Sequence, residues 1–331
     1  MNKTIPLTRV RLLALTIMCL ICSTFTHAQN IYEIGITAGP SNFLGDLGGT
    51  RGRGGPFLKD NNLSMTSMVK SIYFSFAPSE FISFKLAFTS GRLQGADSII
   101  NGAGGLEENR IARNQSFRSP LTEALLTTEI YPTALFDDDP SDVYHKIRPF
   151  GIIGVGVFHF NPQGLYVDAN GNSQWVDLKP LRTEGQGIIA GRPEYKLTQI
   201  NIPYGFGLKY FVNDKVNVSL EVLGRKTFTD YIDDVSTTYI DENLFYNYFK
   251  NDPQLADMAV KMAYQSKILT GGQNRAGFNA GDKRGTATNY DAYYTTSLRV
   301  AIRLGSDNKG ITGYKPQGRS SHSKLKCPIR F

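Results

Sequence analysis

The segment 199–222, QINIPYGFGLKYFVNDKVNVSLEV, alternates apolar and polar residues on both sides of the four residues VNDK. Before this turn, one face carries bulky apolar residues at every second position: Ile200, Ile202, Tyr204, Phe206, Leu208 and Tyr210. The other face carries glycine and polar residues, Lys209 among them. A period of two residues predicts a pair of strands joined by a tight turn, with one face against apolar surroundings.

The same pattern recurs along the chain. Rich in β-branched and aromatic residues, the predicted strands are 31–39, 69–77, 82–90, 121–131, 147–160, 198–211, 216–226 and 293–304. Short connections (78–81, 212–215 and the moderate 132–146) alternate with long ones (40–68, 91–120, 161–197 and 227–292). An even strand number with short and long connections in alternation is typical of outer-membrane proteins. We therefore predict an all-β fold, an eight-stranded antiparallel up-and-down transmembrane β-barrel with long extracellular loops.

The alternative is a soluble β-sandwich or a periplasmic lipocalin-like barrel. Either would turn the apolar faces inward, and the bulky residues on them would overfill the lumen of so small a barrel. The apolar faces are thus predicted to contact outer-membrane lipid. For the predicted strand 147–160, the inward and outward sides are not assigned, because glycine and apolar residues occupy both sides of this strand.

Charges of both signs fall on the predicted inward positions. They are Glu33, Lys85, Glu123, Glu129, Lys209, Glu221, Arg225, Arg299 and Arg303. An eight-stranded barrel is just wide enough to be filled by its own side chains. An isolated buried charge is very costly, whereas opposite charges satisfy one another. These residues predict an interior charge network and a plugged barrel, not a pore.

The N-terminal residues predict export. Arg9 and Arg11 precede the apolar run LLALTIMCLICSTF, and Thr26 and Ala28 form a small-residue cleavage site. The expected organisation is a cleaved signal peptide over 1–28, an outer-membrane barrel over 29–304 and a basic periplasmic tail over 305–331. An even strand number places the N- and C-termini together in the periplasm.

Charge and cysteine content exclude several function classes. Removing three basic residues of the signal reduces the net charge from +7 to 7 − 3 = +4, which does not indicate a nucleic-acid partner. Only Cys327 remains, so an intrachain disulfide and a zinc cluster are excluded. No serine accompanies His145 or His159 in a recognisable motif, so no catalytic residue, cofactor or enzyme activity is predicted.

Two loop motifs have weaker meanings. Asp230, Asp233 and Asp234 could offer oxygen ligands to Ca²⁺, but their spacing is not that of an EF-hand and no metal site is predicted. Asp252 and Pro253 predict a helix start, with the apolar residues that follow packing on the barrel rim or forming a groove for a partner.

Several stretches together resemble one family. They are GPSNFLGDLGG (39–49), PFGIIGVGVFHFNPQG (149–164), LKPLRTEGQG (178–187), IPYGFGLKY (202–210), VLGRKTFTDYIDDVSTTY (222–239) and KCPIRF (326–331). The chain resembles the PorG-type outer-membrane barrels found with the Type IX secretion system of Bacteroidota. The resemblance implies a non-catalytic barrel associated with the periplasmic ring of the PorK lipoprotein and its partner PorN.

Two functions remain open at this point. The first is an anchor for the periplasmic ring of the Type IX secretion (gliding-associated) machinery, contacted through the tail. The tail carries six basic residues against one acid, 6 − 1 = +5, and the expected contact residues are Lys324, Lys326, Cys327, Arg330 and Phe331. The second is an outer-membrane surface receptor or adhesin that acts through its long external loops.

Overall fold

A computed structural model describes residues 31–47, 63–100, 107–135, 146–168, 170–266 and 278–304. Its barrel strands are β1 (Ile31–Leu44), β2 (Ser67–Ala77), β3 (Ile82–Ala96), β4 (Ser116–Ile130), β5 (Ile147–Phe160), β8 (Thr198–Phe211), β9 (Val216–Thr227) and β10 (Ala292–Leu304). The remaining elements are the strands β6 (Gln163–Val167) and β7 (Ser173–Asp177), the helices α2 (Glu107–Arg113), α4 (Glu242–Tyr248) and α5 (Pro253–Ala263), and the short 3-10 helices η2 (Leu63–Met65), η3 (Asp97–Ile99), η4 (Pro132–Leu135) and η5 (Lys179–Leu181).

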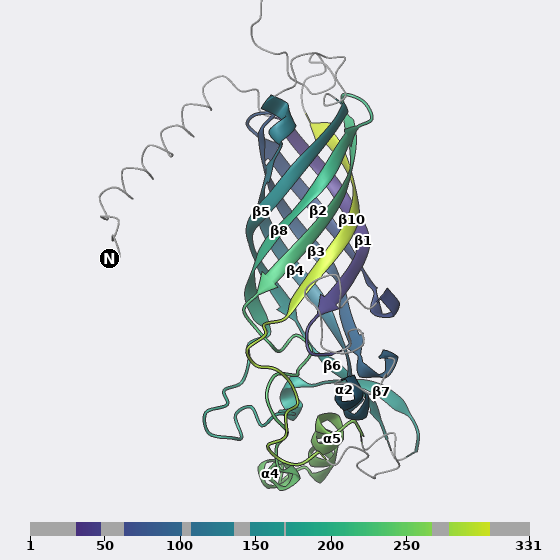
Figure 1. Cartoon of the computed structure of the whole chain (residues 1–331), viewed down its shortest axis with the longest axis vertical. Helices are drawn as coiled ribbons and strands as arrows, with labels where there is room; N and C mark the ends of the chain where they lie inside the picture. Colours follow the sequence, from purple (N-terminus) through teal and green to yellow (C-terminus); the bar gives the residue numbers. More distant parts are fainter. Residues whose placement is uncertain are drawn as a thin grey trace, which may run out of the picture.

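The eight long strands form a closed, antiparallel up-and-down barrel (Figure 1). The strands neighbour one another in the order β3-β2-β1-β10-β9-β8-β5-β4, and the pairing of β3 with β4 closes the sheet. The prediction of an eight-stranded transmembrane barrel is confirmed. The helices of the described part of the chain include none long and apolar enough to cross a bilayer.

Three predicted segments differ in length from the structure. The strands predicted at 31–39, 82–90 and 121–131 extend further, so β1, β3 and β4 project beyond the barrel wall at the long-loop end (Figure 1). The segment 161–197, predicted as a loop, contains the hairpin β6–β7, which joins the sheet through the pair Arg118↔Gln163. Arginine, glycine and proline between 91 and 120 interrupt the apolar alternation. For this reason the pattern predicted an end of β3 that is too early and a start of β4 that is too late.

The outer and inner faces of the barrel wall differ in polarity. Phe206 and Ile200 on β8 are 66% and 60% exposed, whereas Asn201 and Lys209 on the opposite face are 2% and 5% exposed. Every barrel strand places large apolar residues on its outer side. The prediction that the apolar face of the strand pair at 199–222 points outward is confirmed. An apolar outer surface of this kind is typical of a barrel surrounded by lipid.

The connections at the long-loop end fold into a compact unit, which we call the external cap (Figure 1). Its apolar core includes Leu178, Leu181, Phe245, Val260 and Met262. The predicted start of α5 is confirmed, since the Asp252 carboxylate accepts the Leu255 N–H at 3.0 Å and Pro253 opens the helix. The helix packs against α4, β6 and η5 inside the cap. The carbonyl of its last residue, Ala263, accepts a hydrogen bond from the Gln115 side chain beside the start of β4, so the helix also contacts the end of the barrel sheet.

Candidate functional site

The middle of the lumen holds two acids and two bases. Lys85 lies 3.0 Å from Glu221 and 3.2 Å from Glu129. Arg299 lies 2.7 Å from Glu129 and 3.0 Å from Glu221. The four groups come from β3, β4, β9 and β10 and are all buried, so each charge faces two of opposite sign across the barrel. Breaking such an arrangement would leave an uncompensated buried charge.

Two further layers lie above and below this quartet. Toward the short-turn end, Glu33 binds Lys209 at 3.0 Å, Asn217 at 3.0 Å and Arg303 at 3.7 Å. Toward the cap, the Glu123 carboxylate accepts hydrogen bonds from Arg225 at 3.2 Å and from the Tyr293 hydroxyl at 2.8 Å. The charges are therefore paired along the whole length of the lumen.

Aromatic rings fill the space between the charged layers. The Arg299 guanidinium lies 4.7 Å from the ring of Tyr73 and 5.5 Å from that of Phe150. Lys209 lies 5.2 Å from the ring of Tyr131, whose hydroxyl donates to Glu129. A cavity lined by Tyr73, Lys85 and Glu221, among others, leaves about 10 Å³ for the centre of a water molecule. That is room for about one water, so side chains fill this part of the lumen.

The structure brings together all nine residues that the alternation placed inside the barrel. Arg148 was not among them, although it is buried in the lumen and lies 2.6 Å from Glu80. It belongs to β5, whose faces the sequence did not distinguish. The tail residues Lys324, Lys326, Cys327, Arg330 and Phe331 lie outside the described residues.

A second buried polar network holds the external cap together. Arg113 forms a bidentate pair with Asp97, at 2.7 and 2.8 Å. The same guanidinium donates to the carbonyls of Asp46 at 2.6 Å and Arg284 at 2.7 Å. One side chain thus joins the segments that follow β1 and β3 to the segment that precedes β10.

Glu184 and Arg284 form the centre of this network. The Glu184 carboxylate accepts from the backbone N–H groups of Ser236 and Thr237, both at 2.9 Å, and from Arg284 at 2.9 Å. Arg284 also donates to the carbonyl of Asp234. Burial beside Glu184 and Asp234 leaves the pKa of Arg284 above its usual value, because these acids outweigh the desolvation of the guanidinium. The motifs TEGQG and DYIDDVST are the two sides of this contact.

The acidic run 230–234 is part of the cap core. Asp234 accepts from the Thr183 and Tyr195 hydroxyls, and Asp233 accepts the N–H groups of Leu47 at 3.2 Å and Val235 at 3.0 Å. Among the described residues, no three His, Cys, Asp or Glu side chains are arranged to hold a metal ion. Asp233 and Asp234 therefore bind the protein's own backbone and hydroxyl groups.

Asp230 differs from its two neighbours. It is buried, and in the described part of the chain its carboxyl oxygens make no close hydrogen bond. Burial, together with the nearby acids Asp46 and Glu184, raises the pKa of Asp230 to about 8, against a partial lowering by the Ser236 side chain. Asp233 and Asp291 are also buried, and their pKa values lie well above the usual range for the same reason. Of these three groups, the Asp230 carboxyl retains its proton near neutral pH.

A family model describes most of the chain. It matches residues 11–253 and is described as a domain of unknown function, DUF6089. The chain belongs to the DUF6089 family. The match extends from the N-terminal segment to the start of α5, so it includes seven of the eight barrel strands and much of the cap. No curated protein matches this DUF6089 member in sequence.

Solved structures share only a distant likeness with the DUF6089 chain. Ail, the attachment invasion locus protein of Yersinia pestis, has 8% identity and a TM-score of 0.34, covering 84% of this chain and 100% of Ail. The outer membrane protein OprG from Pseudomonas aeruginosa has 7% identity and a TM-score of 0.34, covering 85% of this chain and 99% of OprG. The N-terminal β-barrel domain of Pseudomonas aeruginosa OprF has 8% identity and a TM-score of 0.29, covering 83% of this chain and 100% of the OprF domain. Scores this low place no constraint on what the DUF6089 chain does.

Proposed function

We propose that this DUF6089 protein is a non-catalytic outer-membrane anchor that holds a protein assembly to the membrane. The observation that carries the proposal is the sealed lumen, in which Lys85, Glu129, Glu221 and Arg299 pair across the barrel. A barrel whose interior is occupied by its own side chains offers no path for a solute. Its contribution to the cell is then made by its surfaces: the lipid-facing wall, the external cap and the periplasmic ends.

The assembly we propose is the periplasmic ring of the Type IX secretion machinery. The support is the resemblance of the quoted motifs to PorG-type barrels, together with the basic segment 305–331 that follows β10. Four of the six motif stretches contain residues of the two networks: 202–210 contributes Lys209 to the lumen, and 39–49, 178–187 and 222–239 contribute Asp46, Glu184 and Asp234 to the cap. A tail of net charge +5 suits a partner with an acidic face.

A pull-down tests this proposal. The chain, tagged within the external cap, is purified from detergent-solubilised outer membrane of its host, and the bound proteins are identified by mass spectrometry. We expect ring proteins of the PorK and PorN type to accompany the full chain and to be lost when the chain is stopped after Leu304. Copurification of the ring with the shortened chain would contradict the role of the tail, and its absence from both would contradict the proposed assembly.

A second candidate function is recognition at the cell surface. The observation that favours it is the cap, whose buried pairs Arg113–Asp97 and Arg284–Glu184 give it a defined shape. A pre-formed surface loses less conformational entropy on binding than flexible loops do. Cells that carry a chain with α4 and α5 replaced by a short linker distinguish the two functions. An anchor keeps its periplasmic partner after this change, whereas a receptor or adhesin loses attachment.

A further inference from the structure

The outward side of the barrel strands, including the ends that project toward the cap, carries charges of one sign only. At outward positions of the eight described strands, the charged residues are Lys70 on β2, Arg92 on β3, Arg118 on β4 and Lys226 on β9, and no acid occurs. Inward positions, by contrast, carry acids and bases in pairs. A basic side chain on the lipid-facing side of a barrel is destabilising unless it reaches water or an anion.

Three of these four cations lie next to one another. Lys70 faces Ser90, and Arg92 follows two residues later on the same side of β3. Arg92 faces Pro120, and Arg118 lies two residues away on the same side of β4. Diagonal neighbours on adjacent strands lie about 7–8 Å apart. We call Lys70, Arg92 and Arg118 the basic stripe.

Nothing on the described chain neutralises the first two members of this stripe. No described carboxylate pairs with Lys70 or Arg92. Arg118 hydrogen-bonds to the Gln163 side chain at 2.9 Å and lies 4.2 Å from the ring of Trp175. A basic side chain next to an aromatic ring, such as Arg118 beside Trp175, is characteristic of the membrane–water interface. Adjacent like charges repel, so an anion between them would be stabilised.

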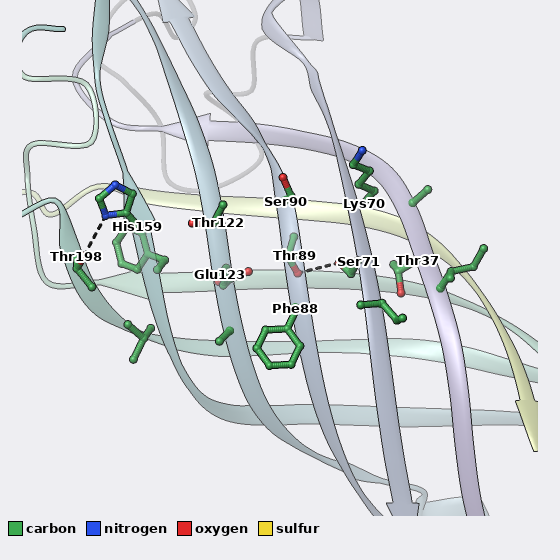
Figure 2. A pocket seen from close by; sticks show the side chains of 16 residues that line it. Thr37, Lys70, Ser71, Phe88, Thr89, Ser90, Thr122, Glu123, His159 and Thr198 are labelled. Atoms are coloured by element: carbon green, nitrogen blue, oxygen red, sulfur yellow. Dashed lines mark hydrogen bonds between the residues drawn. The ribbon is translucent and has the colours of Figure 1, made fainter. Parts of the chain in front are cut away.

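A groove begins directly beside the stripe. It has a volume of about 840 Å³ and crosses the outer wall from β1 to β8 (Figure 2). One side is a row of cross-strand partners with polar side chains: Lys70, Ser90, Thr122, His159 and Thr198. Figure 2 shows these residues in line across the strands, with Phe88 set apart on the other side. Polar atoms thus line one edge of the groove.

The other side of the groove is apolar. Its residues are also cross-strand partners, one step nearer the short-turn end: Ile72, Phe88, Ala124 and Val157. Ile72 is 54% exposed and Phe88 is 56% exposed. A ligand that fits both sides has an anionic head and an apolar tail.

We propose that this groove binds one phosphorylated membrane lipid in the leaflet nearer the cap. Lys70 and Arg92 bind the phosphate oxygens, and the Ser90 and Thr122 hydroxyls donate to the head group. An acyl chain lies against Ile72 and Phe88. A guanidinium and an ammonium with no acid beside them match a phosphate, which a guanidinium binds through two parallel hydrogen bonds. The site requires only a barrel embedded in a bilayer and is independent of the proposed periplasmic partner.

Native mass spectrometry of the full chain in detergent tests the site, with dioleoylphosphatidic acid as the probe and dioleoylphosphatidylcholine as its zwitterionic counterpart. We expect one phosphatidic acid molecule to be retained in preference to phosphatidylcholine. The double variant Lys70→Gln with Arg92→Gln is expected to weaken retention by roughly tenfold or more, because it removes both cations that bind the phosphate. Lys226→Gln, an outward cation on the far strand β9, is the matched control and keeps the retention of the native chain.

A second variant separates shape from charge. Ser90→Trp leaves the basic stripe intact and places a large ring in the groove, so it is expected to lower retention as well. Heat-dependent gel mobility establishes that each variant is folded. Equal retention of the two lipids, retention unchanged in the double variant, or full displacement by excess inorganic phosphate would each overturn the proposal, the last because a free anion would then be the ligand.

Discussion

Glu221 shows what a single buried charge does in this lumen. It accepts from Lys85 and from Arg299, both at 3.0 Å, and is 5% exposed. Glu221→Leu removes the acid and leaves both cations facing only Glu129. We expect a loss of about 3–5 kcal/mol in barrel stability, measured as a lower midpoint in heat-dependent gel migration. The outward neighbour Leu220→Ala serves as control, and an unchanged midpoint for Glu221→Leu would show that the pairs contribute nothing.

Asp230 allows a prediction with a defined pH dependence. Its folded pKa of about 8 lies above the ordinary value of about 4. The folded cap binds this proton more readily than the unfolded chain, so the stabilising contribution is complete below pH 4 and is lost as the pH rises to about 8. Asp230→Asn cannot ionise, and we expect it to stabilise the cap by about 1–3 kcal/mol at pH 9 and to change little at pH 4.

Limited proteolysis at the two pH values measures this difference. The variant should resist cleavage within the cap longer than the native chain at pH 9, and equally long at pH 4. Asp214→Asn, in the exposed turn between β8 and β9, is the control. Faster cleavage of Asp230→Asn at pH 9 would mean that the ionised carboxylate has a stabilising partner.

The sequence predicts the position of a buried charge only where that residue lies on a strand with a clear alternation. The nine lumen charges follow from a period of two, since each lies on a strand with one apolar face. The inward position of Arg148 could not be predicted from the alternation, because Phe150 and Ile152 make the inner side of β5 as apolar as its outer side. The cap residues have no period, and their partners are remote: Arg113 donates to a carbonyl 171 residues away.

At the scale of the elements, one contact of the cap joins two loops that are far apart in the chain. Arg284 connects the TEGQG segment to residues 234–237 through Glu184. Arg284→Met leaves this buried carboxylate with the N–H donors of Ser236 and Thr237 and the Thr237 hydroxyl but no cation, and we expect a cap less stable by about 3–5 kcal/mol. Proteolysis should then cut between β9 and β10 while the heat-modifiable barrel persists.

Lys283→Met is the control for this element, because residue 283 is exposed while its neighbour is buried. Loss of the barrel together with the cap would show that the two fold as one cooperative unit. The sequence indicated α5 through Asp252 and Pro253. It gave no sign of the hairpin β6–β7, whose five-residue strands are too short for an alternation to be recognised.

At the scale of the molecule, the described residues form a barrel whose lumen is filled by side chains, with a lipid-facing wall and the external cap. The number of strands, their antiparallel order and the outward apolar faces followed from the sequence, because alternation and connection length together specify an up-and-down barrel. The external cap could not be predicted, since long loops fold through contacts that join segments far apart in the chain.

The central claim is that this barrel is sealed, and conductance across a planar lipid bilayer tests it most directly. With Glu33, Glu123, Glu129 and Glu221 all paired to bases inside the lumen, the purified chain should insert and carry no steady ionic current. Insertion is verified separately by the heat-dependent mobility of chain recovered from the bilayer lipid. A stable, stepwise current from the native chain would contradict the sealed lumen and, with it, the proposal that the protein acts through its surfaces.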